Sequence, residues 1–106
     1  MHPWWMIDLE DPKYVFSVDI LPRQNSFRYR FHDIEVRVGF TPPTDDNFSH
    51  WLLLGFYKGR YSLDQGVITF TNSSGLCGQY VVVQRVSSDF DQLQLNEVQV
   101  FAKNIL

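Results

Sequence analysis

The segment YVFSVDIL, at residues 14–21, is the clearest indication of secondary structure in the chain. Its large apolar side chains occupy every second position, at Tyr14, Phe16, Val18 and Ile20. Ser17 and Asp19 fall between them, on the opposite side. Because successive side chains of a strand point to opposite faces of a sheet, this alternation predicts a β-strand with one apolar face. The preceding EDPK, at residues 10–13, predicts a turn.

Similar short runs recur along the rest of the chain, at DIEVRVGF (33–40), WLLLGFY (51–57), GVITF (66–70) and QYVVVQR (79–85). In the first of these, Ile34, Val36 and Val38 are expected to face inward, whereas Glu35 and Arg37 face outward. The loop TPPTDDN, at residues 41–47, follows it. Each run predicts a strand.

The run LQLNEVQVFA, at residues 93–102, changes phase part-way. Leu93 and Leu95 occupy odd positions, whereas Val98 and Val100 occupy even ones. An inward face that switches in this way predicts a β-bulge at Asn96 and Glu97.

Together these runs predict an all-β protein of roughly seven short strands, arranged as an antiparallel β-sandwich of the jelly-roll type. No window shows a sustained apolar repeat at helical spacing, and the 106 residues suffice for one domain. We therefore expect a single domain over residues 1–106.

Composition excludes several classes of function. Nine basic and twelve acidic residues give a net charge of −3, which argues against a general nucleic-acid binder. The longest apolar run is too short to span a membrane. Catalytic motifs such as a nucleophile elbow or a phosphate-binding glycine loop are not recognisable, so we expect no enzyme.

Basic residues are locally concentrated between positions 23 and 30, where Arg23, Arg28 and Arg30 occur. A guanidinium group is planar and presents five fixed donors, so two of them can hold adjacent hydroxyl oxygens of one sugar. The alternative is a solvated edge whose arginines form weak surface ion pairs with acids such as Asp33.

The order of HPWWMIDL, VDILPR, IEVRVG, CGQYVVVQ and LQLNEVQVF resembles that of F-type lectins (fucolectins). These lectins belong to the discoidin-like, coagulation-factor type C group of galactose-binding-like sandwiches. Arg23, Asn25 and Arg30 occupy the three positions of the family's Arg-x-Asp-x4-Arg/Lys motif, and IEVRVG follows at the expected place. Asn25 replaces the acid of that motif, which removes a charged acceptor between the arginines.

The resemblance implies a carbohydrate-binding site at Arg23, Asn25 and Arg30. It also implies calcium as a structural ion, held in part by the backbone carbonyl of Asn96 and by Glu97. The first strand of the family domain, its calcium loop and its motif histidine have no counterpart here, so we expect an N-terminally incomplete domain.

The implied function is a lectin module that binds fucose-type glycans or glycoproteins and belongs to a secreted or cell-surface protein. The alternative is a discoidin-like adhesion module that has lost sugar binding and contacts other extracellular proteins. Weak affinity for single sugars would favour several domains acting together, which leaves a homo-oligomer open.

Overall fold

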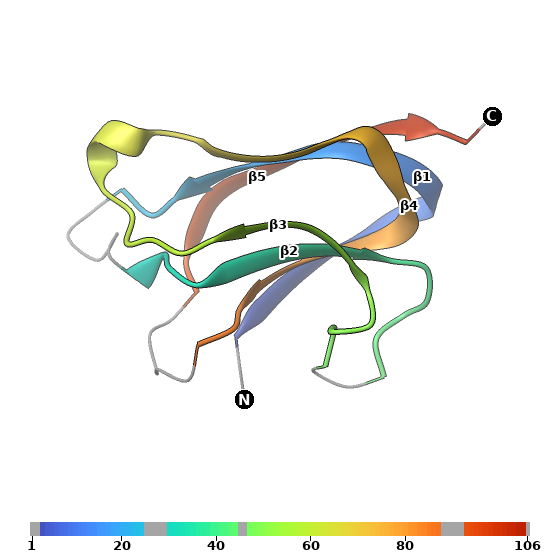
Figure 1. Cartoon of the computed structure of the whole chain (residues 1–106), viewed down its shortest axis with the longest axis horizontal. Coiled ribbons are helices and arrows are strands. Elements are labelled where there is room, and N and C mark those ends of the chain that lie inside the picture. Colours follow the sequence, from blue (N-terminus) through green and yellow to red (C-terminus); the bar gives the residue numbers. More distant parts are fainter. Residues whose placement is uncertain (1–2, 25–29, 45–46, 88–92, 106) are drawn as a thin grey trace.

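The computed structural model describes residues 3–24, 30–44, 47–87 and 93–105. Its elements are the strands β1 (Trp4–Pro22), β2 (Ile34–Gly39), β3 (Leu52–Tyr57), β4 (Ile68–Arg85) and β5 (Leu95–Asn104), and the short 3-10 helix η2 (Leu63–Gln65). The strands are antiparallel neighbours in the order β3-β2-β4-β1-β5 (Figure 1). Within the described part of the chain, no helix has the length and apolarity needed to cross a bilayer.

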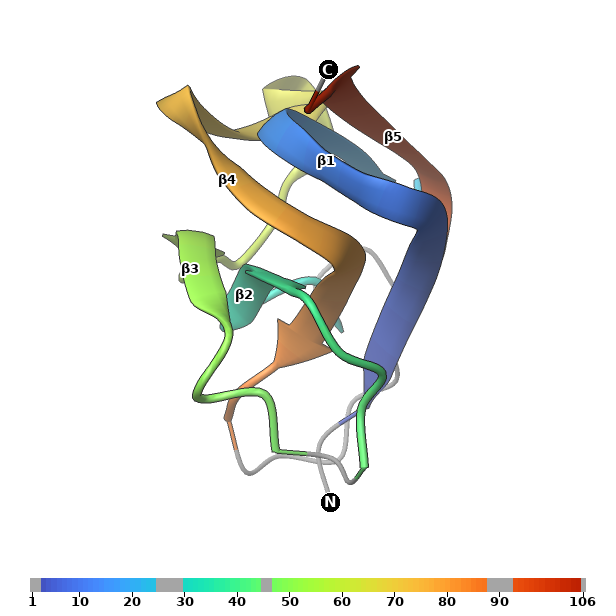
Figure 2. The same ribbon diagram turned by 90° about the vertical axis from the view of Figure 1, so that its right-hand side faces the viewer.

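The sandwich forms because β1 and β4 are long and bent, so that each contributes to both layers (Figure 2). Along β1, the pairing with β5 is confined to residues 13–22, and along β4, the pairing with β2 is confined to residues 80–85. The all-β sandwich predicted from the sequence is confirmed. The number of strands differs, because the predicted strands in GVITF and QYVVVQR belong to the two ends of one strand, β4, and YVFSVDIL is the second half of β1, which begins at Trp4.

The single apolar face predicted for residues 14–21 was wrong. The pairing of β1 is interrupted between Val15 and Ser17, where residues 72–75 of β4 lie opposite Phe16 alone. Val15, Val18 and Ile20 are fully buried, whereas Tyr14 is 39% exposed. An irregularity at Phe16 therefore switches the inward face from odd to even positions.

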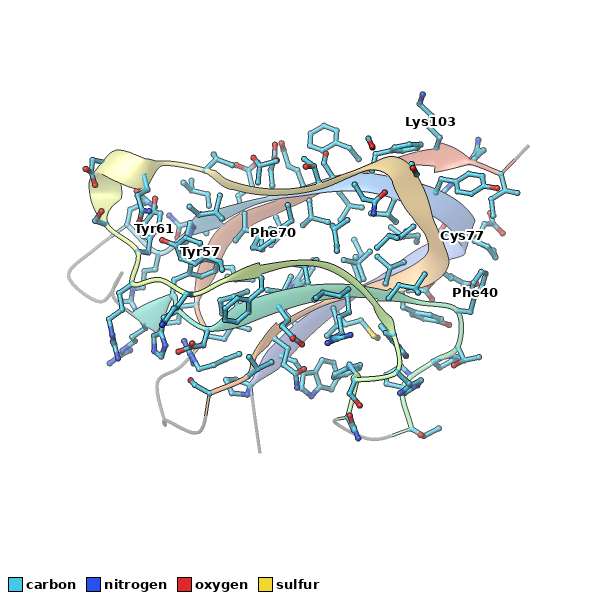
Figure 3. All side chains as sticks on the ribbon, viewed as in Figure 1. Phe40, Tyr57, Tyr61, Phe70, Cys77 and Lys103 are labelled. Atoms are coloured by element: carbon cyan, nitrogen blue, oxygen red, sulfur yellow. The ribbon has the colours of Figure 1, made fainter. Side chains whose placement is uncertain are left out.

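The core lies between the two layers and is formed mainly by β-branched side chains. Ile34, Val36 and Val38 are fully buried, as their alternation predicted. Figure 3 shows Phe70 and Tyr61 directed into the space between the layers, while Lys103 projects outward. The end of β1 and the start of β2 lie on one side of this core, at left in Figure 1.

A second apolar cluster covers the outer face of β4 and is called here the outer cluster. It consists of Phe48, Trp51, Tyr80 and Val82, with Met6 packed against it. The Trp51 ring meets the Phe48 ring edge-on, at 5.0 Å between centroids. The loop that joins β2 to β3 thus supplies two aromatic anchors that hold it against the sheet.

The two tryptophans near the start of β1 face opposite ways, as strand alternation predicts. Trp5 packs against the core between the layers, whereas Trp4 lies outside, with its ring 5.3 Å from that of Phe48.

Asp8 makes stability depend on pH where β1 bends. Its carboxylate accepts hydrogen bonds from Gln79 Nε2 at 3.0 Å and from the backbone N–H of Glu10 at 2.8 Å. The Gln79 bond, and then the Glu10 bond, lower the pKa of Asp8 below its ordinary value of 3.8. The ionised form therefore stabilises the fold above pH 3.8, and this contribution is lost as pH falls through the lower folded-state pKa.

We expect an Asp8→Asn variant to lose this pH dependence, because an amide oxygen accepts both bonds without titrating. Urea unfolding at a series of pH values should show the parent protein losing more stability than the variant as pH falls below 3.8. Parallel stability curves would contradict the assignment.

Candidate functional site

The described arginines of the sequence cluster lie at the end of one strand and shortly before the start of another. Arg23 directly follows β1, and Arg30 lies four positions before β2 begins at Ile34. Both residues are half-buried. Asn25, Arg28 and the aromatic candidates Phe27 and Tyr29 lie outside the described residues, so their predicted roles stay predictions.

The two guanidinium groups converge on one oxygen atom. Arg23 Nη1 donates a hydrogen bond to Oε1 of Gln94 at 2.5 Å. Arg30 Nη1 donates to the same Oε1 atom at 3.4 Å. Residues seven positions apart in the sequence are thus aimed at a shared point, supplied by a residue about seventy positions further along the chain.

The bulge at the start of β5 explains why Gln94 meets the arginines. Leu21 pairs with Glu97, but the next residue, Pro22, pairs with Leu95, so Asn96 is an extra residue in β5. Continued alternation from Val98 would have turned Gln94 inward. The extra residue instead leaves Leu95 against the core and Gln94 on the opposite side. The bulge predicted at Asn96 and Glu97 is confirmed.

Arg85 supports the site from within. It is the last residue of β4, is fully buried, and donates from Nη2 to the backbone carbonyl of Arg30. A buried charged donor fixes its acceptor strongly, because neither group can exchange its partner for water. The backbone that carries Arg30 is therefore tied to the central strand of the sheet.

Two neighbours of the arginines belong to the core instead of the ligand site. Phe31 is buried and packs against the rings of Tyr57 and Tyr61, at 5.4 and 6.1 Å between centroids. Phe31 therefore packs in the core and does not offer its ring to a sugar. His32 is also buried, and its Nδ1 lies 2.7 Å from an Asp33 carboxylate oxygen.

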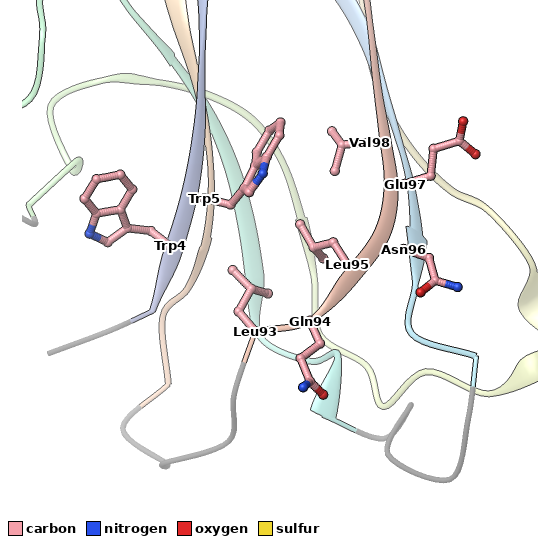
Figure 4. Close-up of a pocket in the computed structure, with 8 residues that line it drawn as sticks. All are labelled: Trp4, Trp5, Leu93, Gln94, Leu95, Asn96, Glu97 and Val98. Atoms are coloured by element: carbon pink, nitrogen blue, oxygen red, sulfur yellow. The ribbon is translucent and has the colours of Figure 1, made fainter.

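Gln94 also borders an open hollow of about 580 Å³ (Figure 4). Trp5, Leu93, Leu95 and Val98 provide its apolar lining. Figure 4 shows the side chain of Gln94 directed away from Leu93 and Leu95. The hollow falls within the usual volume range of small-molecule sites. Apolar surface and converging polar groups therefore occur side by side at this end of the sandwich.

A solved lectin shares this fold. The crystal structure of an F-lectin (fucolectin) from the serum of striped bass, Morone saxatilis, matches with a TM-score of 0.76 and 28% sequence identity. The match covers 100% of this chain and 33% of that one. The chain resembles an F-type lectin in sequence and in fold.

A second relative of this F-type lectin-like chain is the Pentraxin fusion protein of Xenopus laevis, which is 32% identical over 102 residues. That match covers 96% of this chain and 23% of the fusion protein. The chain thus spans a third or less of the length of either relative. No protein-family model matches it.

The calcium ligands implied by the F-type lectin resemblance, the Asn96 carbonyl and Glu97, lie at the bulge of β5. Asn96 and Glu97 are both exposed at the bulge, and Glu97 Oε1 accepts a bond from Gln99 Nε2 at 3.3 Å. Calcium takes six to eight oxygen ligands. No group of three or more His, Cys, Asp or Glu side chains that could hold a metal occurs among residues 3–24, 30–44, 47–87 and 93–105. Calcium at Asn96 and Glu97 stays a prediction.

Sequence reasoning missed Gln94 and Arg85, two residues that contact the arginines. The phase change in LQLNEVQVFA indicated that Gln94 turns away from the core. Nothing local to QYVVVQR indicates that Arg85 is buried, because a terminal arginine of a strand is ordinarily exposed.

Proposed function

We propose that the chain is a carbohydrate-binding lectin module and that Arg23 and Arg30 bind a fucose-type sugar. The observation that carries this proposal is the shared acceptor of the two guanidinium groups, Oε1 of Gln94. Two guanidinium groups held in one direction by a shared acceptor can present their other N–H donors to neighbouring hydroxyl or ring oxygens of one sugar. The described relative is itself a fucolectin, which supports fucose as the first sugar to test.

The expected setting is extracellular, since one relative comes from serum and the other is a pentraxin fusion protein. Binding glycans on glycoproteins requires donors on a rigid scaffold and no chemical step. The site meets that requirement, because both arginines flank strands and Arg30 is tied to buried Arg85. Asn25 completes the proposed set by its place in the motif.

We expect Arg23→Ala and Arg30→Ala each to weaken binding of methyl α-L-fucopyranoside about ten- to hundredfold, because each change removes a charge-assisted donor. Titration calorimetry measures the affinity, and a glycan array measures specificity. Lys103→Ala is the matched control, since it removes one positive charge from an exposed site on the far part of β5. Equal weakening by all three changes would indicate a nonspecific charge effect and contradict the site.

An adhesion module without sugar binding is the second candidate. It is favoured by the exposure of Leu52, Leu53 and Phe56 along β3, which is an edge strand of the sheet. Exposed apolar side chains on an edge strand are suited to contact another protein. A correctly folded protein that binds nothing on the glycan array would support this candidate over the lectin.

A further inference from the structure

We infer that Gln94 is the positioning residue that pre-organises the arginine pair, in place of the acidic acceptor that Asn25 does not supply. The inference rests on the proposed function for its sugar, but its geometry stands on contacts of the sugar-free protein. It assigns a role in recognition to the segment before β5, which is distant in sequence from the arginine motif.

The backbone of Gln94 is fixed relative to Arg23. The N–H of Arg23 donates to the carbonyl oxygen of Gln94 at 3.4 Å, one step beyond the last pair of the β1–β5 ladder, Pro22 with Leu95. The side chain adds the 2.5 Å bond from Arg23 Nη1 to Oε1. Two bonds between the same two residues leave little freedom for either side chain, so the direction of the Arg23 guanidinium group is set before any ligand arrives.

The side-chain amide brings Arg30 to the same point. An amide oxygen has two lone pairs and can accept from both arginines at once. The 3.4 Å contact with Arg30 Nη1 is the longer of the two. The two positive groups repel each other, and a shared acceptor offsets part of that cost. Gln94 therefore lowers the ordering cost that a sugar would otherwise have to meet on binding.

Gln94 is neutral, which distinguishes it from a carboxylate in the same place. A carboxylate accepts stronger, charge-assisted hydrogen bonds and would hold both guanidinium groups more tightly. An amide keeps the two groups together while leaving their positive charge uncompensated by this residue. Such a pair favours electron-rich ligand oxygens, which is the chemistry of sugar hydroxyl and ring oxygens.

The test compares Gln94→Leu with Gln94→Glu, using Gln99→Leu as the control. Leucine has a similar size but no acceptor, whereas glutamate keeps an acceptor oxygen at the same reach. Gln99 lies on β5 and is exposed, and its side-chain amide donates to Glu97. Two quantities are measured: affinity for methyl α-L-fucopyranoside, and the arginine side-chain NMR signals of the sugar-free protein.

We expect Gln94→Leu to weaken sugar binding about three- to tenfold and to shift the side-chain signals of Arg23 and Arg30, because a charged–neutral hydrogen bond to each is lost. In Gln94→Glu the arginine side-chain signals should remain ordered, as in the parent protein. Gln99→Leu should change neither the affinity nor the signals. If the parent protein binds no fucoside, the proposed sugar is wrong. If its arginine signals still shift in Gln94→Leu, the positioning role of Gln94 is nevertheless supported. Unchanged arginine signals in Gln94→Leu, or unchanged or tighter sugar binding, would overturn the role of Gln94.

Discussion

Truncation of Trp51 to alanine is expected to lower the free energy of unfolding by about 3–5 kcal/mol. The indole is only 5% exposed and is the centre of the outer cluster, between the rings of Phe48 and Tyr80. Its removal leaves a cavity that the sheet beneath cannot fill. Urea denaturation followed by circular dichroism measures the loss.

Trp4→Ala is the matched control for this prediction. Trp4 also contacts Phe48 edge-on, but it is 38% exposed. Less apolar surface returns to water when it is truncated, so its effect should be clearly smaller. Gly39→Ala should act in the same direction as Trp51→Ala, because an added Cβ would lie 2.2 Å from an indole atom of Trp51. Equal effects of the two tryptophan changes would show that the outer cluster is not anchored at Trp51.

Replacement of Arg85 by alanine is the second large effect, with an expected loss of about 3–5 kcal/mol. The side chain is fully buried and donates to the carbonyl of Arg30. Its loss leaves a cavity at the end of β4 and removes the charged donor from that carbonyl. The backbone that presents Arg30 is then less fixed, so affinity for a fucoside should fall together with stability.

Arg85→Met separates packing from hydrogen bonding in this prediction. Methionine fills much of the volume with an adaptable apolar chain but donates nothing. It should recover part of the stability lost in Arg85→Ala while leaving sugar affinity weakened. Thermal melts and calorimetric titration of the same samples provide both measurements. Sugar binding at parental strength in the Met variant would show that Arg85 acts on stability alone.

Local patterns predicted the parts of the fold in which alternation is uninterrupted. Ile34, Val36 and Val38 of β2 face inward as expected, and the phase change around Asn96 marks a real bulge. The bends of β1 and β4 were not predictable in this way. The turn-like segments EDPK (residues 10–13) and TNSSGL (residues 71–76) coincide with the two interruptions of the β1–β4 pairing, at residues 9–12 of β1 and 72–75 of β4, so they mark irregularities inside long strands and do not end them.

The candidate site was likewise predictable only in part. Arg23 and Arg30 were identified from their spacing and from the resemblance to F-type lectins, and the structure brings them to one oxygen. The acceptor itself was not identified, because Gln94 joins them only through the β1–β5 register. A contact between segments about seventy residues apart cannot be predicted from the sequence of either segment alone.

The two shared strands have a mechanical consequence for the whole domain. Since β1 and β4 pass through both layers, neither layer can leave as an independent unit, and separating them would expose the core that they share. Opening of the sandwich should therefore be all-or-none, with no stable half-domain. The arginines lie just outside the strands, beyond the end of β1 and before the start of β2, and their contacts with Gln94 and Arg85 tie them to the start of β5 and the end of β4.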